Sequence, residues 1–312
     1  MAEDAAAPGV PNADVDSAVA ADVPCRKCGY NLRGLPAAGR CPECGSAVGL
    51  SVHGDLLRFS DPAWVLKLRR GAKFIVYGVA TIFLGLILTV VLAFVLAELA
   101  PQVVPILMSV FAIAGYGLIL GGTWQLTEPD PSGLGEKEYG TARKIIRAAL
   151  VIGIINLLMS LVPSVAVLPP PVRVAFQIIS FAAGIAAVVG FVAQLHYLRK
   201  LSLRIPDPVL ADRAQSLKYG IGITHGMLLL LTVMVSIADG PGAGAVQVLG
   251  CLSGVIGLVL LVLFLVYLRL LERLSARFRD EAVVAEQTWA SAEAVARGWP
   301  SDPPAAPPVP QA

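Results

Sequence analysis

The chain has 312 residues, of which 56% are hydrophobic and 15% are charged, and its formal net charge is +2. An average soluble domain carries about 25% charged residues, so this composition argues against a soluble globular protein. The small net charge gives no support for a nucleic-acid-binding protein.

The chain begins with an acidic segment. Residues 1–22 contain five acidic residues, no basic residue and no apolar periodicity. Such a segment buries too little apolar surface to fold, so we expect a disordered tail. The first residues lack the basic and apolar regions of a signal peptide, and we expect the N-terminus to stay in the cytoplasm.

Two CxxC pairs follow, in a domain that we place at residues 23–50. Cys25 and Cys28 form the first pair, Cys41 and Cys44 form the second, and 12 residues separate the pairs. A CxxC turn presents two thiolates from one tight knuckle, and four thiolates make the tetrahedral set of a structural zinc site. The sequence therefore predicts a four-cysteine zinc ribbon with Zn²⁺ as its cofactor.

The residues around the cysteines favour this interpretation over two others. Gly29 and Gly45 directly follow the second cysteine of each pair, where a knuckle turn tends to need a positive φ. A redox role would call for a thioredoxin-like βαβ context, which is missing. A nucleic-acid surface could use the nearby cations and an aromatic residue, but four thiolates and one Zn²⁺ are net negative, and basic neighbours offset that charge. We expect no nucleic-acid partner for the surface formed by Arg26, Lys27, Tyr30, Arg33 and Arg40.

The sequence CRKCGYNLRGLP at 25–36, followed by CPECG at 41–45, carries a family resemblance. It is similar to the N-terminal signature of a large group of uncharacterised bacterial multi-pass membrane proteins with a zinc ribbon. The resemblance covers residues 25–45 closely, and beyond them only the plan of a ribbon followed by hydrophobic helices. It implies the four cysteines as ligands and a membrane location, and it brings no known activity. A weaker likeness is to paraquat-inducible protein A, which also pairs cytosolic CxxC motifs with membrane helices.

Residues 51–73 are predicted to form a linker and a short interfacial helix. His53 has no ligand role because the four-cysteine set is complete. Asp61 is expected to cap the helix, with Pro62 as its first residue. Trp64 and Leu68 would face acyl chains, while cations would face anionic headgroups. These cations are Lys67, Arg69, Arg70 and Lys73.

Six apolar segments follow, in a region that we place at residues 74–270. Each is 20–23 residues long and lacks Asp, Glu, Lys and Arg, and about 20 apolar residues cross the roughly 30 Å of hydrocarbon in a bilayer. Soluble core helices almost always show a polar stripe, which these segments lack. The sequence therefore predicts an all-α integral membrane bundle of six transmembrane helices in three hairpins, at 75–97, 103–124, 148–168, 174–195, 219–238 and 246–268.

The loops predict the orientation of the bundle and point to an internal repeat. Of the 24 Lys and Arg residues, 23 lie on one side and Arg173 lies on the other. By the positive-inside rule, both termini are cytoplasmic, in the inner membrane. The first two hairpins end in Pro-Asp-Pro, at 129–131 and 206–208. Duplication would explain this pattern, and so would convergence on interfacial residues.

The chain after the last span is predicted to form a cytoplasmic helix over 271–298 and a disordered Pro-rich tail over 299–312. The helix segment alternates charge with Leu271, Leu274, Phe278 and Trp289. This pattern is typical of a helix that lies on a membrane surface or binds a partner.

Polar residues inside the spans are the candidates for intramembrane chemistry. Asn156 lies near the middle of the third span, and His225 lies about 10 Å in from the cytoplasmic edge of the fifth. Gln177 and Gln194 lie toward opposite ends of the fourth span, and His196 closes its edge. An intramembrane polar residue is a functional candidate by default, but no Asp or Glu accompanies these. We interpret them as interhelix hydrogen-bond groups.

Small residues in the spans predict close helix packing rather than catalysis. A Ser253–His225 dyad would make the chain an intramembrane hydrolase, but neither the usual glycine-flanked serine nor an oxyanion donor is evident. We therefore expect no enzyme. Packing faces are expected at the GxxxG pairs Gly117/Gly121, Gly222/Gly226 and Gly250/Gly254.

Together these features predict a non-enzymatic membrane protein. Its ribbon and C-terminal helix would dock a cytoplasmic protein partner, and its bundle would sit in the lipid bilayer as an anchor or a homo-oligomer. The alternative is a transporter or lipid-handling protein, with Asn156 and His225 along its path and Asp130 and Asp207 at its mouth.

Overall fold

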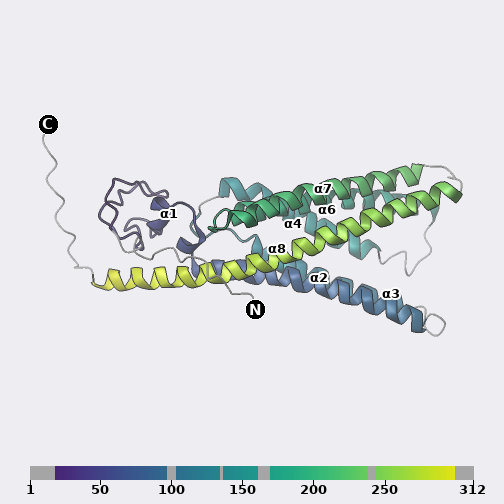
Figure 1. The fold of residues 1–312 in the computed structure, drawn as a ribbon, viewed down its shortest axis with the longest axis horizontal. Coiled ribbons are helices and arrows are strands. Elements are labelled where there is room, and N and C mark those ends of the chain that lie inside the picture. The colour runs from purple at the N-terminus through teal and green to yellow at the C-terminus, as the bar shows by residue number, and fades with distance from the viewer. Residues whose placement is uncertain (1–17, 97–102, 134–135, 161–168, 238–242, 299–312) are drawn as a thin grey trace, which may run out of the picture. The chain divides into compact units, whose positions relative to one another are not determined.

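Figure 1 shows the computed structural model, which describes residues 18–96, 103–133, 136–160, 169–237 and 243–298. Within these ranges the chain forms helices joined by turns, with isolated β-bridges and no strand. The all-helical class is confirmed. Most of the predicted acidic tail and all of the predicted Pro-rich tail lie outside the described residues.

The chain divides into two compact units, which are described one at a time. The smaller contains the N-terminal residues up to Pro62 together with the residues from Glu281 onward. The larger contains residues 63–280.

The smaller unit is built on the two CxxC turns and two short helices, α1 (Gly49–Val52) and η2 (Leu57–Phe59). Its core contains Leu32 and Val48, which are fully buried, and two of the cysteines. Val19 belongs to the same core, and its backbone N–H donates to the carbonyl of Leu35 at 2.9 Å. The ordered module therefore begins before residue 23, because the apolar side chain of Val19 completes its core.

The same unit includes the C-terminal part of α8 (Ala243–Gly298), a single continuous helix. The face that α8 buries here repeats at helical spacing and includes Ala282, which is 3% exposed, and Ala285, which is fully buried. Glu281 on this face forms an ion pair with Arg58 at 3.3 Å. The segment predicted to lie on a membrane or bind a partner thus packs within the chain itself.

The larger unit contains most of the remaining helical residues. Proline is the first residue of α2, α6 and α7, a position where its missing N–H costs nothing. α4 packs against α6, and α6 packs against α7. The helices are α2 (Pro62–Leu96), α3 (Val103–Leu126), α4 (Glu136–Ser160), α6 (Pro170–Ser202), α7 (Pro208–Ile237) and α8.

Four of these helices are long and apolar enough to cross a membrane. They are Pro62–Leu92, Ile106–Leu126, Pro171–Ser202 and Gly250–Ala290, which correspond to the predicted first, second, fourth and sixth spans. Large side chains such as Ile87 and Ile178 point outward with more than 60% of their surface exposed, as lipid-facing residues do. The third and fifth predicted spans run beyond the described residues, since α4 ends at Ser160 and α7 at Ile237. They stay predictions.

The predicted interfacial helix is the first part of α2, with no break before the apolar stretch. Trp64 is 3% exposed and Leu68 is fully buried, so neither faces acyl chains as expected. Their burial is explained by local partners: the Trp64 indole N–H donates to the carbonyl of Glu128 at 3.1 Å. This segment supports the larger unit instead of lying on the lipid.

α2 and α3 approach most closely at glycines spaced seven residues apart. A Cβ atom on Gly71 would lie 2.6 Å from the carbonyl oxygen of Gly122, and one on Gly78 would lie 2.6 Å from that of Gly115. Both helices therefore present a small-residue seam with the seven-residue period of a coiled-coil interface. This seam lets the two backbones touch.

The GxxxG expectation is wrong in the described part of the chain. A Cβ atom added at Gly117, Gly121, Gly226, Gly250 or Gly254 meets nothing within 4 Å. At Gly222 it meets only the Val192 side chain, at 3.4 Å. The motif gives the spacing of small residues, but it does not say which face of a helix meets a neighbour.

Candidate metal centre and intramembrane cavity

The four predicted cysteine ligands lie together in the smaller unit. All four Sγ atoms are within 4.8 Å of one another. Two of these pairs join the two knuckles: Cys25 to Cys44 and Cys28 to Cys41, each at 3.6 Å. In a tetrahedral site with metal–sulfur bonds of about 2.3 Å, the sulfurs stand about 3.8 Å apart. The thiol positions therefore fit one metal ion held by all four residues.

Glycines shape both knuckles. Gly29 has φ 80° and its N–H donates to the Cys25 carbonyl at 2.8 Å. Gly45 has φ 68° and its N–H donates to the Cys41 carbonyl at 2.9 Å. The predicted positive φ is confirmed at both positions. A residue with a side chain would be strained there.

The surroundings of Cys25 favour its ionised form. Burial raises the pKa of this thiol, but the backbone N–H groups of Cys28 and Lys27, together with the thiols of Cys44 and Cys28, outweigh burial and lower the pKa to about 7. Cys25 and Cys41 are buried, whereas Cys28 is exposed. N–H groups aimed at a sulfur stabilise its negative charge, as a thiolate ligand requires.

The cations near the cysteines contact groups of the protein. Arg33 lies 3.5 Å from the carboxylate of Asp22, and the guanidinium of Arg26 donates to the carbonyl of Leu50 at 3.4 Å. His53 stacks on Phe59 with ring centroids 5.4 Å apart and lies outside the cysteine group.

Arg40 joins the second knuckle to α8. Its guanidinium carbon lies 3.7 Å from the centre of the Trp289 ring. The Trp289 indole N–H donates to the carbonyl of Ser60 at 2.9 Å. The Trp289 indole thus holds the end of α8 through two contacts. One is with Arg40, which directly precedes Cys41, and the other is with Ser60, just before α2.

A cavity of about 280 Å³ lies inside the larger unit, between α2, α3, α4, α6 and α8. Its walls are mainly aliphatic and aromatic. Gln194 reaches it from α6, is 8% exposed, and its side-chain nitrogen has no hydrogen-bond partner. A buried amide without a partner costs about 1–3 kcal/mol. The aromatic lining is Phe83, Tyr116, Phe191, Phe264 and Tyr267.

The other intramembrane polar candidates are not brought to this cavity. His225 lies on α7, where its Nδ1 is 3.3 Å from the carbonyl of Ile221 in the same helix. Asn156 lies on α4 with its side-chain oxygen buried and unpartnered, and it is not among the residues lining the cavity. Ser253 is half-buried on α8.

The two loop acids expected at the mouth of a path are paired with arginines. Asp130 lies 2.8 Å from Arg204, and each of these side chains is only 5% exposed. Asp207 lies 3.0 Å from Arg277. In both cases the arginine follows the aspartate by about one hairpin length, 74 and 70 residues. Sequence inspection missed these pairs because nothing local marks which arginine an aspartate will meet.

No protein-family model, curated protein or solved structure matches the chain. The site is therefore interpreted from its own chemistry.

Proposed function

We propose that this chain is a multi-pass inner-membrane protein whose N-terminal module is a structural zinc ribbon that docks a cytoplasmic protein partner. The observation that carries the proposal is the convergence of four thiols within 4.8 Å. Four protein ligands fill a tetrahedral site and leave no open position for a substrate, as in structural zinc sites. Cys25, Cys28, Cys41 and Cys44 would hold the ion, which would cross-link the two knuckles.

A non-enzymatic role is the simplest interpretation of this arrangement. The metal would stabilise a unit too small to hold its shape by core packing alone. Tyr30, directly after the first knuckle, is 40% exposed, and an exposed tyrosine is a common anchor at protein interfaces. The flank near Arg40 is occupied by Trp289 of the same chain. The Tyr30 side is therefore the face that we assign to the partner.

The proposal includes six spans with both termini in the cytoplasm. Support comes from the one-sided distribution of 23 of 24 cations and from the four long apolar helices. A membrane-impermeant thiol reagent tests it on variants that lack Cys251 and carry one new cysteine. We expect labelling from outside when the new cysteine replaces Gly240 and none when it replaces Ser132; labelling from outside at the position of Ser132 would contradict the orientation.

Crosslinked co-purification tests the docking role. The wild-type chain is compared with the Cys25→Ser/Cys44→Ser variant, and Cys251→Ser serves as the control because its exposed thiol lies outside the group. We expect specific partners with the wild type and the control, and loss of these partners when the ribbon is broken. The same partners on the broken ribbon would refute docking.

The cavity favours one second candidate, a lipid-handling protein. An apolar chamber with a single unpartnered amide fits an apolar molecule with one hydrogen-bond acceptor. Gln194, rather than Asn156 or His225, would contact that molecule.

Mass spectrometry of organic extracts tests this second candidate. Wild type is compared with Gln194→Leu, and Gln177→Leu on the same helix is the control. We expect one apolar compound to co-purify with wild type and control and to be depleted in Gln194→Leu. Equal extracts from all three chains would remove this candidate.

A further inference from the structure

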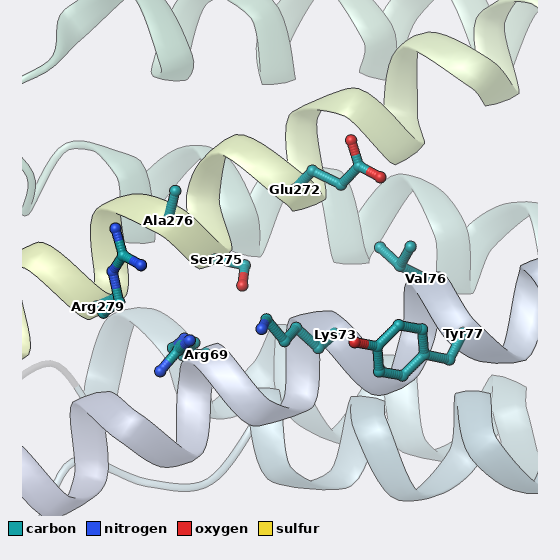
Figure 2. Close-up of a pocket in the computed structure, with 8 residues that line it drawn as sticks. All are labelled: Arg69, Lys73, Val76, Tyr77, Glu272, Ser275, Ala276 and Arg279. Carbon is teal, nitrogen blue, oxygen red and sulfur yellow. The ribbon is translucent and has the colours of Figure 1, made fainter.

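A basic cleft of about 300 Å³ lies between α2 and α8 in the larger unit. Figure 2 shows the side chains of Arg69 and Lys73 on α2 and of Arg279 on α8 on either side of this space, with the Ser275 hydroxyl between the two helices. Glu272 lies further along α8, beside Val76. The lining thus contains three cations and one carboxylate, and the cations gather away from the carboxylate.

Two of the three cations of this cleft have no ion-pair partner among the residues that the structure describes. In the described part of the chain, neither Arg69 nor Lys73 forms an ion pair, although both are half-buried. Arg279 forms an ion pair with its exposed sequence neighbour Asp280, at 3.4 Å, and such a surface pair contributes little. Arg69 and Lys73 can therefore form charged hydrogen bonds with a bound anion.

Several other cations of the larger unit are paired with acidic side chains. Lys67, two residues before Arg69, contacts Glu128 at 2.7 Å. The arginines that close the two loops have aspartate partners at 2.8 and 3.0 Å. What sets the cleft apart is that its three cations line one space between two helices.

One end of the cleft, around Lys73, lies where lipid headgroups would be, and Ser275 and Arg279 lie further from the spans. Lys73 comes two residues before the predicted first span and Ser275 seven residues after the last, which at 1.5 Å per residue is about 3 and 10 Å along their helices. The headgroup layer on each side of a bilayer is about 5–8 Å thick. Tyr77, which also lines the cleft and is 53% exposed, has the amphipathic ring typical of this layer.

We propose that this cleft binds the phosphodiester group of an anionic membrane phospholipid. Arg69, Lys73 and Arg279 donate charged hydrogen bonds to the phosphate oxygens, and the Ser275 hydroxyl lies close enough to the cleft to add another. The acyl chains extend along the apolar surface of α2 beyond Tyr77. A soluble phosphate compound offers the same anion without those chains, and the position of Lys73 and Tyr77 at the membrane interface favours the lipid as the occupant.

Native mass spectrometry of the full chain in detergent tests this proposal. Phosphatidylglycerol or phosphatidylcholine is titrated into the wild type and into Arg69→Gln/Lys73→Gln. The control is Arg70→Gln/Lys144→Gln, which removes the same charge from two exposed residues outside the cleft. We expect one phosphatidylglycerol to be retained by wild type and control, and about tenfold or greater weakening in the cleft variant. Arg279→Gln, at an exposed position, provides a second measurement and should weaken retention in the same direction.

Three results would overturn the proposal. The first is equal weakening of phosphatidylglycerol retention in the cleft and control variants. The second is retention of phosphatidylcholine as strong as that of phosphatidylglycerol. The third is retention of inorganic phosphate or glycerol phosphate by the lipid-free chain at the concentration at which phosphatidylglycerol is retained. The last result would assign the cleft to a soluble phosphate compound. Matching size-exclusion profiles for all variants establish that loss of binding is not loss of fold.

Discussion

At the scale of single residues, the buried ion pair between Asp130 and Arg204 has the largest predicted effect on stability. Removing one partner leaves a charge uncompensated in a site where each side chain is 5% exposed, and such changes cost about 3–5 kcal/mol. We expect Asp130→Asn to lower the midpoint temperature of thermal unfolding in detergent by more than its control does. Asp207→Asn is the control, because Arg277 is 49% exposed and a surface pair contributes about 0–1 kcal/mol. Equal shifts in the two variants would contradict this account.

Residue identity allowed the grouping of the four cysteines to be predicted, but not the ion pairs. The four cysteines could be predicted because two close pairs of thiols in one short segment have few other uses. The glycines after each pair could also be predicted, since the knuckle requires a positive φ that Gly29 and Gly45 adopt. Asp130 and Arg204 are 74 residues apart, and only the packing of the hairpins brings them together.

At the scale of the helices, the glycine seam between α2 and α3 makes a testable prediction. A methyl group on Gly78 would lie 2.6 Å from the Gly115 carbonyl oxygen, which is too close without moving a backbone. We expect Gly78→Ala to destabilise the larger unit by about 1–3 kcal/mol in thermal unfolding. A methyl group at Gly117 would meet open space. Gly117→Ala should therefore leave the stability unchanged or raise it by up to about 1 kcal/mol through helix propensity. A tolerated Gly78→Ala would show that the seam is not tightly packed.

The presence of the long apolar helices could be predicted from composition, whereas the contacts between helices could not. Uncharged stretches of about 20 or more residues define spans whatever they pack against. A contact face depends on which neighbour a helix meets. For this reason Trp64 and Leu68, which looked suited to lipid, are buried inside the unit, and most of the GxxxG glycines face open space.

The end of α8 gives a second prediction at this scale. Trp289 holds this segment through the Ser60 carbonyl and the Arg40 guanidinium. We expect Trp289→Ala to speed amide hydrogen exchange over residues 281–290, while Gln287→Ala, an exposed neighbour, leaves it unchanged. Exchange that is the same in both variants would mean that the indole does not fix the helix end.

At the scale of the whole molecule, the proposed ion links the knuckles to the α8 segment within the smaller unit. Arg40 directly precedes Cys41 and stacks on Trp289, so loss of the metal should loosen the second knuckle and the helix end together. We expect a chelator to increase exchange at residues 281–290 of the wild type. Chelation that affects only residues 25–45 would separate the ribbon from the helix.

The most direct test of the metal centre is the zinc content of the purified full chain, measured by plasma mass spectrometry. The wild type and the Cys251→Ser control are predicted to hold one Zn²⁺ per chain after dialysis without added metal. Cys25→Ser/Cys44→Ser is predicted to hold none, because two thiolates do not complete the tetrahedral site. A wild type without zinc, or a double variant that retains a full equivalent, would contradict the assignment of these four cysteines.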